Sequence, residues 1–223
     1  RHQPEFTMIE WYRLGLGLDS IIDDTLQMIQ AALTTAVLSD EPIRFEYRDC
    51  FVDNANVDPL TAATEELADA AGADAGLRQS IGDERDDWLD LILTTRVAPC
   101  FEPHRLTVLR HYPASQAALA RLCPNDSRVA DRFEVFIGAI ELANGYVELV
   151  DAEEQAARIE RDNEERRRRR RTVRPHDSKL LAALEAGLPA CAGVAVGFER
   201  LQMIVAETED MRDVITFSFE TAP

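Results

Sequence analysis

The stretch from 132 to 149, RFEVFIGAIELANGYVEL, constrains the fold of this chain more than any other segment. Every second residue of its first half is apolar, which predicts a β-strand with one buried face made of Phe133, Val135 and Ile137. A hairpin turn can form at Asn144-Gly145, a common turn pair, or at Gly138-Ala139. With the turn at Gly138-Ala139, Glu134 and Glu141 can lie near each other on paired strands.

A second alternating segment, Glu5–Arg13, is also expected to be a strand. One of its faces would carry Phe6, Met8, Glu10 and Tyr12. The other would carry Thr7, Ile9 and Trp11, and the last two of these suit a packed core. The acid between two aromatic rings on the first face either faces solvent or contacts a ligand.

The other patterns add several helices and strands. Helices are expected at Asp19–Leu38, Pro59–Ala71, Glu84–Val97, Asp151–Arg171 and Ser178–Ala186. The segment 72–83, rich in Gly and Asp, is expected to be a loop. Strands are expected at Arg105–His111 and Val214–Phe219, and a strand, a glycine turn and a helix follow one another within Val194–Ala206.

The charge of the chain limits its partners. With 24 Lys and Arg residues against 41 Asp and Glu residues, the net charge is −17 over 223 residues. Such a surface repels a phosphate backbone at long range, which argues against general nucleic-acid binding. Arg166–Arg171, an unbroken run of arginines, is either a solvated helix end or a contact surface for an acidic protein partner. The apolar runs are too short to span a bilayer, so no membrane contact is expected.

Sequence motifs exclude several chemistries. The four cysteines form no C-x-x-C pair and the four histidines lack metal-ligand spacing, so a zinc site is not expected and the cysteines are taken as free cytosolic thiols. The chain has no Walker loop, G-x-G-x-x-G or G-x-S-x-G, so a nucleotide site would have to be built on a sheet. Arg200, in the first turn of a helix, either attracts a phosphate or pairs with a surface acid. Glu134 and Glu141 either share Mg²⁺ or face solvent.

Five segments together resemble the elongation factor P–(R)-β-lysine ligase family, a lysyl-tRNA synthetase-like branch of the class II aminoacyl-tRNA synthetases. They are HQPEFTMIEWYR, HYPASQAALARL, RFEVFIGAIELANGYVELVDAEEQ, GLPACAGVAVGFERL and VITFS. The resemblance implies an α+β fold, with the class II antiparallel sheet flanked by helices and incomplete at the N-terminus. It implies one catalytic domain over residues 1–223, from the second half of motif 2 to motif 3, with a helical insertion at about 40–104.

The resemblance also implies roles for residues at an ATP site. Adenine is expected to stack on Phe6, and the phosphates to contact His2 and Arg200. Glu134 and Glu141 are expected to hold Mg²⁺ beside the ATP, and Glu141 and Arg200 are the expected catalytic groups.

The amino-acid substrate implied by the resemblance is lysine or (R)-β-lysine. Its ammonium group is expected at Glu10 and Glu148, with Tyr12 and Asn144 beside them. True lysyl-tRNA synthetases carry glycine at the position of Ala143, whose methyl group removes room beside an α-amino group. Departures from the family pattern occur at Tyr146, Val147, Val150 and Glu199, and these affect fine substrate choice.

The expected activity is ATP-dependent activation of the amino acid as an adenylate, followed by its transfer to a lysine side chain of elongation factor P in the cytoplasm. Two alternatives stay open: a lysyl-tRNA synthetase that charges tRNA, disfavoured by the net charge and Ala143, and a catalytically inactive synthetase-like fragment. Because motif 1 and the first strand of motif 2 would precede Arg1, these 223 residues alone are expected to be inactive, and the complete protein to be a homodimer.

Overall fold

The computed structural model describes residues 3–33, 38 and 40–218, and its architecture is α+β, as predicted. Six strands form one sheet in the order β1-β8-β7-β6-β3-β2, in which all neighbours are antiparallel except β2 and β3. They are β1 (Met8–Leu14), β2 (Ile43–Glu46), β3 (Leu106–Arg110), β6 (Arg132–Ile137), β7 (Ile140–Val147) and β8 (Cys191–Gly197). A separate hairpin consists of β4 (Leu122–Cys123) and β5 (Asp126–Ala130).

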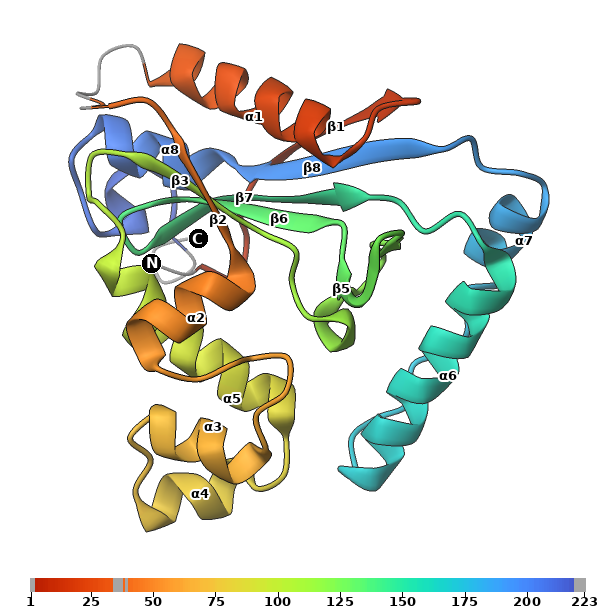
Figure 1. Cartoon of the computed structure of the whole chain (residues 1–223). Coiled ribbons are helices and arrows are strands. Elements are labelled where there is room, and N and C mark those ends of the chain that lie inside the picture. The colour runs from red at the N-terminus through yellow and green to blue at the C-terminus, as the bar shows by residue number, and fades with distance from the viewer. Residues whose placement is uncertain (1–2, 34–37, 39, 219–223) are drawn as a thin grey trace.

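Helices lie on both sides of this sheet, with α1 above it and the others mainly below it or at its ends in Figure 1. They are α1 (Leu18–Ala32), α2 (Tyr47–Ala55), α3 (Thr64–Ala70), α4 (Ala75–Ile81), α5 (Arg85–Ile92), α6 (Ala152–Arg168), α7 (Ser178–Glu185) and α8 (Phe198–Val205). Among the described residues, no helix combines the length and apolar character needed to cross a membrane.

The main core lies between α1 and the sheet. The apolar stripe of α1 is buried against it through Ile21, Ile22, Leu26, Ile29 and Leu33. The partners on β6 are Phe133, Val135 and Ile137, so the predicted alternation of this strand is confirmed. Each such aliphatic side chain contributes roughly 1.5–3 kcal/mol of burial free energy, which fixes the face that each strand turns to α1.

The opposite face of the sheet is covered at one end by a second core. Phe136 on β6 and Leu109 on β3 pack there against the helical segment between β2 and β3, whose largest buried side chain is Trp88. The sheet residues of this core come from the β3–β6 end. The β1–β8–β7 part of the same face is therefore left for a binding site.

The structure settles one local prediction and corrects another. The β6–β7 turn lies at Gly138, whose φ of +51° suits glycine, and Asn144-Gly145 lies inside β7. The segment 72–83 is not a simple loop but contains α4, because the Asp74 side chain accepts a hydrogen bond from the Leu77 amide and caps a helix there.

A predicted helix end and a predicted strand were also wrong. The first helix ends at Ala32 rather than at Leu38, and residues 34–37 lie outside the described part of the chain. No strand forms over the described residues 214–218, where turns and bends follow a short 3₁₀ helix at Met211–Asp213. The side chain of Asp210 accepts a hydrogen bond from the Arg212 amide, which favours the turn over a strand.

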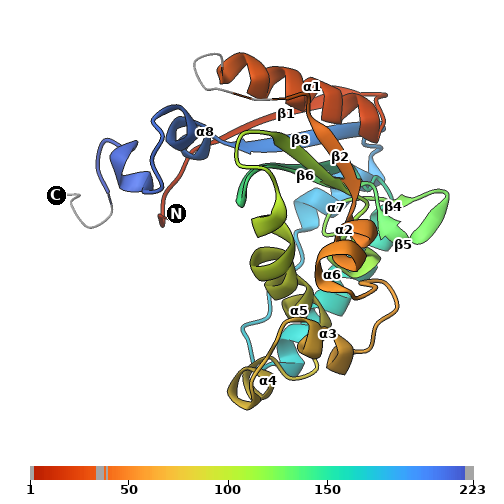
Figure 2. The same ribbon diagram turned by 60° about the vertical axis from the view of Figure 1, so that its left-hand side comes forward.

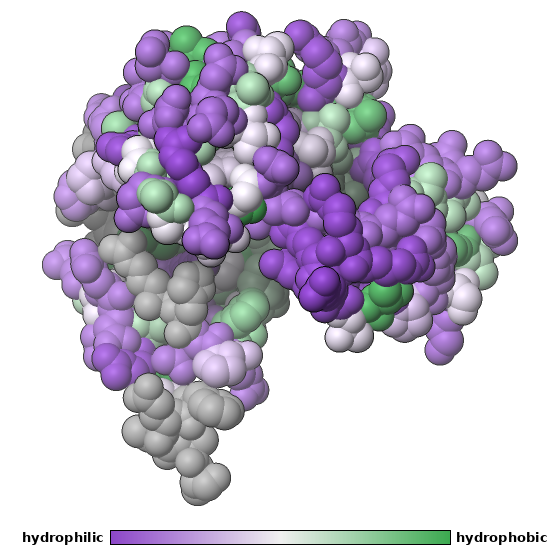
Figure 3. Space-filling model, turned by 90° about the horizontal axis from the view of Figure 1, so that it is seen from below, coloured by the Kyte–Doolittle hydropathy of each residue, from purple (hydrophilic) through white to green (hydrophobic). Residues whose placement is uncertain are grey.

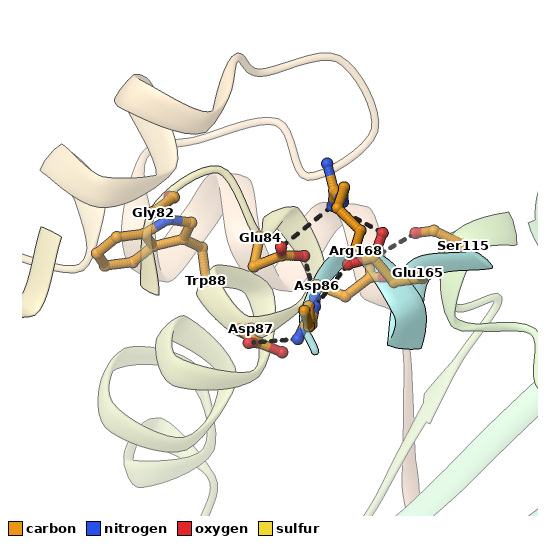
Figure 4. Close-up of polar contacts among 9 residues, drawn as sticks. Gly82, Glu84, Asp86, Asp87, Trp88, Ser115, Glu165 and Arg168 are labelled. Atoms are coloured by element: carbon orange, nitrogen blue, oxygen red, sulfur yellow. Dashed lines mark hydrogen bonds and ion pairs between the residues drawn. The ribbon is translucent and has the colours of Figure 1, made fainter. Parts of the chain in front are cut away.

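The arginine run at the end of α6 is largely engaged within the chain (Figure 4). Arg168 donates to Glu84 over 3.1 Å, and Arg169 pairs with both Glu84 and Asp87 at the start of α5. In the space-filling view from below, hydrophilic residues cover most of the right-hand lobe, where α6 and α7 lie (Figure 3). Contact with an acidic partner stays a prediction, and it now concerns mainly Arg170 and Arg171.

Candidate functional site

Three adjoining hollows lie along the face of the sheet that α1 does not cover. The central hollow, of about 230 Å³, is lined by residues that include Phe6, Met8, Glu141, Asn144 and Arg200. The acidic hollow, of about 130 Å³, is lined by Glu10, Tyr12, Asn144, Tyr146, Glu148 and the β8 backbone. The outer hollow, of about 320 Å³, includes Thr94, Glu134, Phe136, Glu141 and Arg200. Shared lining residues make the three hollows one continuous site.

Strand β1, which begins at Met8 rather than at Glu5 as predicted, supplies one wall of this site together with the residues just before it. Phe6 and Met8 line the central hollow, while Glu10 and Tyr12 line the acidic hollow. On the other face, Trp11 packs against the main core and its Nε1 donates to Asp24 of α1 over 2.8 Å. This anchor holds β1 with the expected face turned toward the hollows.

Ile9 does not behave as a core residue. It remains 37% exposed and lines a separate apolar groove beside α8, so its predicted place in the core was wrong. Its position at the edge of the sheet explains the exposure, because β1 pairs with β8 alone in the described chain.

Strand β8 supplies the floor through small residues. Ala192, Val194 and Val196 face the core, whereas Gly193, Ala195 and Gly197 line the hollows. A Cβ atom on Gly193 would lie 2.6 Å from Tyr12 Cε1 and 3.1 Å from Glu148 Oε1. The acidic hollow therefore exists only because this position carries no side chain.

The lining of the acidic hollow includes two carboxylates, Glu10 and Glu148, and no cationic side chain. Burial raises the pKa of Glu148 to about 7, and no hydrogen bond or ion pair to its carboxylate occurs within the described residues. Burial, followed by the nearby Glu148 and Glu10 carboxylates, raises the pKa of Tyr12. The pKa of Tyr146 is raised to about 12, by burial first and then by Glu148. A cationic group placed here would lower the cost of ionising Glu148.

The outer hollow contains a buried carboxylate with defined partners. Tyr112 Oη donates to Glu134 Oε2 over 2.6 Å, and Arg132 Nη2 donates to Glu134 Oε1 over 2.6 Å. Arg132 also stacks on the Tyr112 ring at 4.5 Å and donates from Nε to Asn144 Oδ1 over 3.2 Å. Burial and the neighbouring Glu141 raise the pKa of Glu134, so the two acids repel each other in spite of Arg132.

Arg200 and Glu141 meet where the central and outer hollows join. Arg200 lies in the first turn of α8, as predicted, and its Nη1 donates to the Glu141 backbone oxygen over 2.7 Å. The same nitrogen is 3.3 Å from Glu141 Oε2. Glu199 does not pair with Arg200 but accepts a hydrogen bond from the Thr7 amide over 2.9 Å, which ties α8 to the start of β1.

The structure brings together the predicted residues that it describes. Phe6, Glu10, Tyr12, Glu134, Glu141, Asn144, Glu148 and Arg200 all line one of the three hollows. Ala143 lies at the floor of the central hollow and is also part of the main core. His2 lies outside the described residues.

Three participants were missed by sequence reasoning, namely Arg132, Tyr112 and Gly193. A glycine inside the alternating strand Cys191–Gly197 was a usable signal, because such glycines often mark a close approach. The other two carried none, since their roles depend on contacts between β6 and the segment after β3.

The chain is similar in sequence to known proteins over almost its whole length. The family model for tRNA synthetases class II (D, K and N) matches residues 1–221. An elongation factor P–(R)-β-lysine ligase of Sodalis glossinidius is 42% identical over 225 residues, covering 99% of this chain and 67% of the relative. Relatives with the same name from Photorhabdus laumondii and Klebsiella pneumoniae are each 41% identical, with 99% and 67% coverage. The chain therefore belongs to the class II tRNA synthetase family of the D, K and N type, and within it to the group of elongation factor P–(R)-β-lysine ligases.

Proposed function

We propose that the protein activates (R)-β-lysine, or lysine, with ATP and transfers it to a lysine side chain of elongation factor P. The observation that carries this proposal is the acidic hollow, which opens through Asn144 and Ala195 into the central hollow. A small molecule with a cationic end and a reactive carboxylate end fits such a pair of connected spaces. The relatives named as elongation factor P–(R)-β-lysine ligases suggest both the amino acid and its acceptor.

The cationic end of the substrate would enter the acidic hollow. Glu10 and Glu148 would accept hydrogen bonds from its ammonium group, and each charge-assisted bond contributes about 1.5–3 kcal/mol. Asn144 and Tyr12 offer further polar contacts beside these carboxylates. Ala143 would reduce the room for an α-amino group, a one-methyl effect of ~1–3 kcal/mol.

ATP would occupy the central and outer hollows. The Phe6 ring, 58% exposed at the entrance, offers a surface on which adenine can stack. Arg200, at the N-terminal end of α8, would bind the terminal phosphates through its guanidinium group, aided by the positive end of the helix.

The residues present also fit a divalent cation. Glu134 and Glu141 are close enough to raise the pKa of Glu134, and a hard cation bound between them would remove that repulsion. Glu134 and Glu141 would hold Mg²⁺ with oxygen ligands only. When bound, Mg²⁺ offsets the negative charge of the phosphate oxygens.

The proposed reaction has two displacements. A carboxylate oxygen of the amino acid attacks the α-phosphorus of ATP, and the bond from that phosphorus to pyrophosphate breaks. The amine of the acceptor lysine then attacks the carbonyl carbon, AMP leaves, and the amine loses a proton as the amide forms. The chain contributes positioning through Glu10 and Glu148 and positive charge through Arg200, with no covalent intermediate on the protein.

We also propose that α2–α5 form a helical insertion within one catalytic domain, since they lie between β2 and β3. The segment that follows α5 supplies Leu93, Thr94 and Ala98 to the outer hollow. A translation factor as acceptor, and cysteines that form no disulfide in the described structure, favour the cytoplasm as the place of action.

ATP–pyrophosphate exchange that depends on (R)-β-lysine, measured with the full-length parent protein, tests the activation step. Exchange should require the amino acid and fall sharply in Glu148→Gln, whereas Glu153→Gln, on the surface at the start of α6, should match the parent protein. Labelled amino acid should then pass to elongation factor P and not to tRNA. Exchange that ignores the amino acid, or labelling of tRNA instead, would reject the proposal.

A further inference from the structure

A cluster of three potential metal ligands lies outside the hollows described above. His111 follows β3, Cys123 ends β4, and Asp131 lies between β5 and β6. One ligand atom from each residue lies within 4.8 Å of the others. In Figure 2 the β4–β5 hairpin projects beside the end of β2, where the three segments meet. Sequence spacing gave no hint of this cluster, because the fold alone brings the segments together.

The imidazole of His111 is oriented for metal binding by a second carboxylate. Its Nδ1 lies 2.6 Å from Glu46 Oε2, so in the neutral ring Nδ1 carries the proton and donates it to Glu46. The lone pair is then on Nε2, which lies 3.8 Å from Asp131 Oδ1. Metal-bound histidines typically donate their other ring N–H to a carboxylate in this way.

Asp131 is likewise held with one oxygen free. It is buried, and its Oδ2 accepts a hydrogen bond from Arg121 Nε over 2.8 Å, which leaves Oδ1 facing His111. His111 itself has a φ of +57°, a conformation that non-glycine residues seldom adopt. The His111 amide donates to the Arg132 carbonyl oxygen over 2.9 Å, which maintains this conformation. Backbone strain of this kind concentrates at functional positions.

We propose that His111 Nε2, Cys123 Sγ and Asp131 Oδ1 bind one zinc ion. Nitrogen, sulfur and oxygen ligands suit this borderline metal, and the charges of a thiolate and a carboxylate neutralise it. Adjacent ligands of tetrahedral zinc are roughly 3.3–3.6 Å apart, so the 3.8 Å between His111 and Asp131 needs only a small closing movement. Cys123 is partly exposed, which leaves the fourth position to water.

The zinc ion ties the β4–β5 hairpin to the sheet. It links the end of β3 to the corner that precedes Arg132, whose side chain contacts Glu134 and Asn144. The ion would thus fix the backbone beneath a residue of the candidate active site, and it takes no part in the reaction there because its three ligands line none of the hollows. It holds independently of which substrate the hollows bind.

Titration of the purified protein with Co²⁺ tests this site, since thiolate ligation adds a charge-transfer absorption in the near ultraviolet. Carboxylate ligands such as Glu134 and Glu141 do not give this band, so a cation in the outer hollow is distinguished. Cys123→Ser should abolish the band, and Cys100→Ser, which removes an exposed thiol elsewhere, should retain it. His111→Asn should also abolish it, because asparagine tolerates the left-handed backbone but offers no imidazole.

Zinc should displace the cobalt signal at a one-to-one ratio, and excess Mg²⁺ should not. Zinc should raise the melting temperature of the parent protein and of Cys100→Ser, and should leave the melting temperature of Cys123→Ser unchanged. The proposal is overturned if the folded parent shows no charge-transfer band, or if the band survives in Cys123→Ser.

Discussion

Replacement of Gly193 by alanine is expected to damage amino-acid recognition while the protein stays folded. The new Cβ atom would lie 2.6 Å from Tyr12 Cε1, whereas ordinary contacts begin at 3.4 Å, so the ring must move by about 0.8 Å. Tyr12 is 60% exposed and can swing outward at little cost to stability. Glu148, whose Oε1 would lie 3.1 Å from the methyl group, must give way by a few tenths of an ångström.

The size of the effect follows from this displacement. Misplacement of a positioning group by ~1 Å can lower a rate about 100-fold. We therefore expect kcat/KM for the amino acid to fall roughly 10- to 100-fold, equivalent to about 1.4–2.7 kcal/mol. The assay is ATP–pyrophosphate exchange by the full-length parent protein and its variant at varied amino-acid concentration, repeated at varied ATP, with melting temperatures recorded for both proteins.

The matched control is Gly76→Ala in α4, where a Cβ atom meets only Asp74 Oδ1 at 3.5 Å. It should behave like the parent protein. The reasoning is refuted if Gly193→Ala keeps its kcat/KM for the amino acid within twofold. It is equally refuted if the KM for ATP rises as much as that for the amino acid.

Three further predictions concern stability and pH. Gly145→Ala should lower the free energy of unfolding by about 1–3 kcal/mol in thermal melts, because its Cβ would lie 2.6 Å from the buried Phe133 ring; an unchanged melting temperature would contradict this. Amino-acid affinity, measured by calorimetry, should rise roughly tenfold from pH 6 to pH 8. The reason is that Glu148, with a pKa of about 7, must be ionised to bind an ammonium group. Glu148→Gln should remove this dependence of affinity on pH. Arg169→Gln should remove the ion pair with Glu84 and lower the local stability of the end of α6 by no more than about 1 kcal/mol. Faster amide hydrogen exchange there would report this loss, and unchanged exchange would show that the pair does not stabilise the helix end.

The sign of the pH effect on folding is opposite to its sign on binding. Burial raises the pKa of Glu148 from 4.5 to about 7, so the native state holds the extra proton between these values. Stability therefore falls as pH rises through this window, while affinity for a cation increases. A pH series of melting curves with Glu148→Gln as reference separates the two effects.

Alternation made one central strand, β6, and one edge strand, β1, predictable. The apolar face of β6 and the hollow-lining face of β1 follow from a period of two, since burial of one face fixes where the other points. The position of Arg200 at the start of α8 was also readable, because a glycine turn separates it from a strand. Local patterns sufficed wherever one element alone decides the direction of a side chain.

Features that depend on several elements were not readable. Gly193 matters because Tyr12 and Glu148, which belong to other strands, converge on it. The strand expected over Val214–Phe219 does not form in its described part, 214–218. Local hydrogen bonds around Asp210 favour a turn, and no neighbouring strand competes for that backbone in the described chain. Ile9 has the place of a core residue in the alternation, but its strand lies at the sheet edge and has a neighbouring strand on one side only, so the side chain stays partly exposed.

Arg132 lies between the two halves of the site, and this gives its contacts a thermodynamic meaning. The same guanidinium group donates hydrogen bonds to the Glu134 carboxylate and to the Asn144 side-chain oxygen. A change of charge near one of these acceptors therefore alters the hydrogen bond to the other. We therefore expect occupancy of the proposed phosphate side and of the proposed ammonium side to be linked through this shared side chain. Linkage is reciprocal, so the factor by which bound ATP raises the affinity for the amino acid equals the factor by which the bound amino acid raises the affinity for ATP.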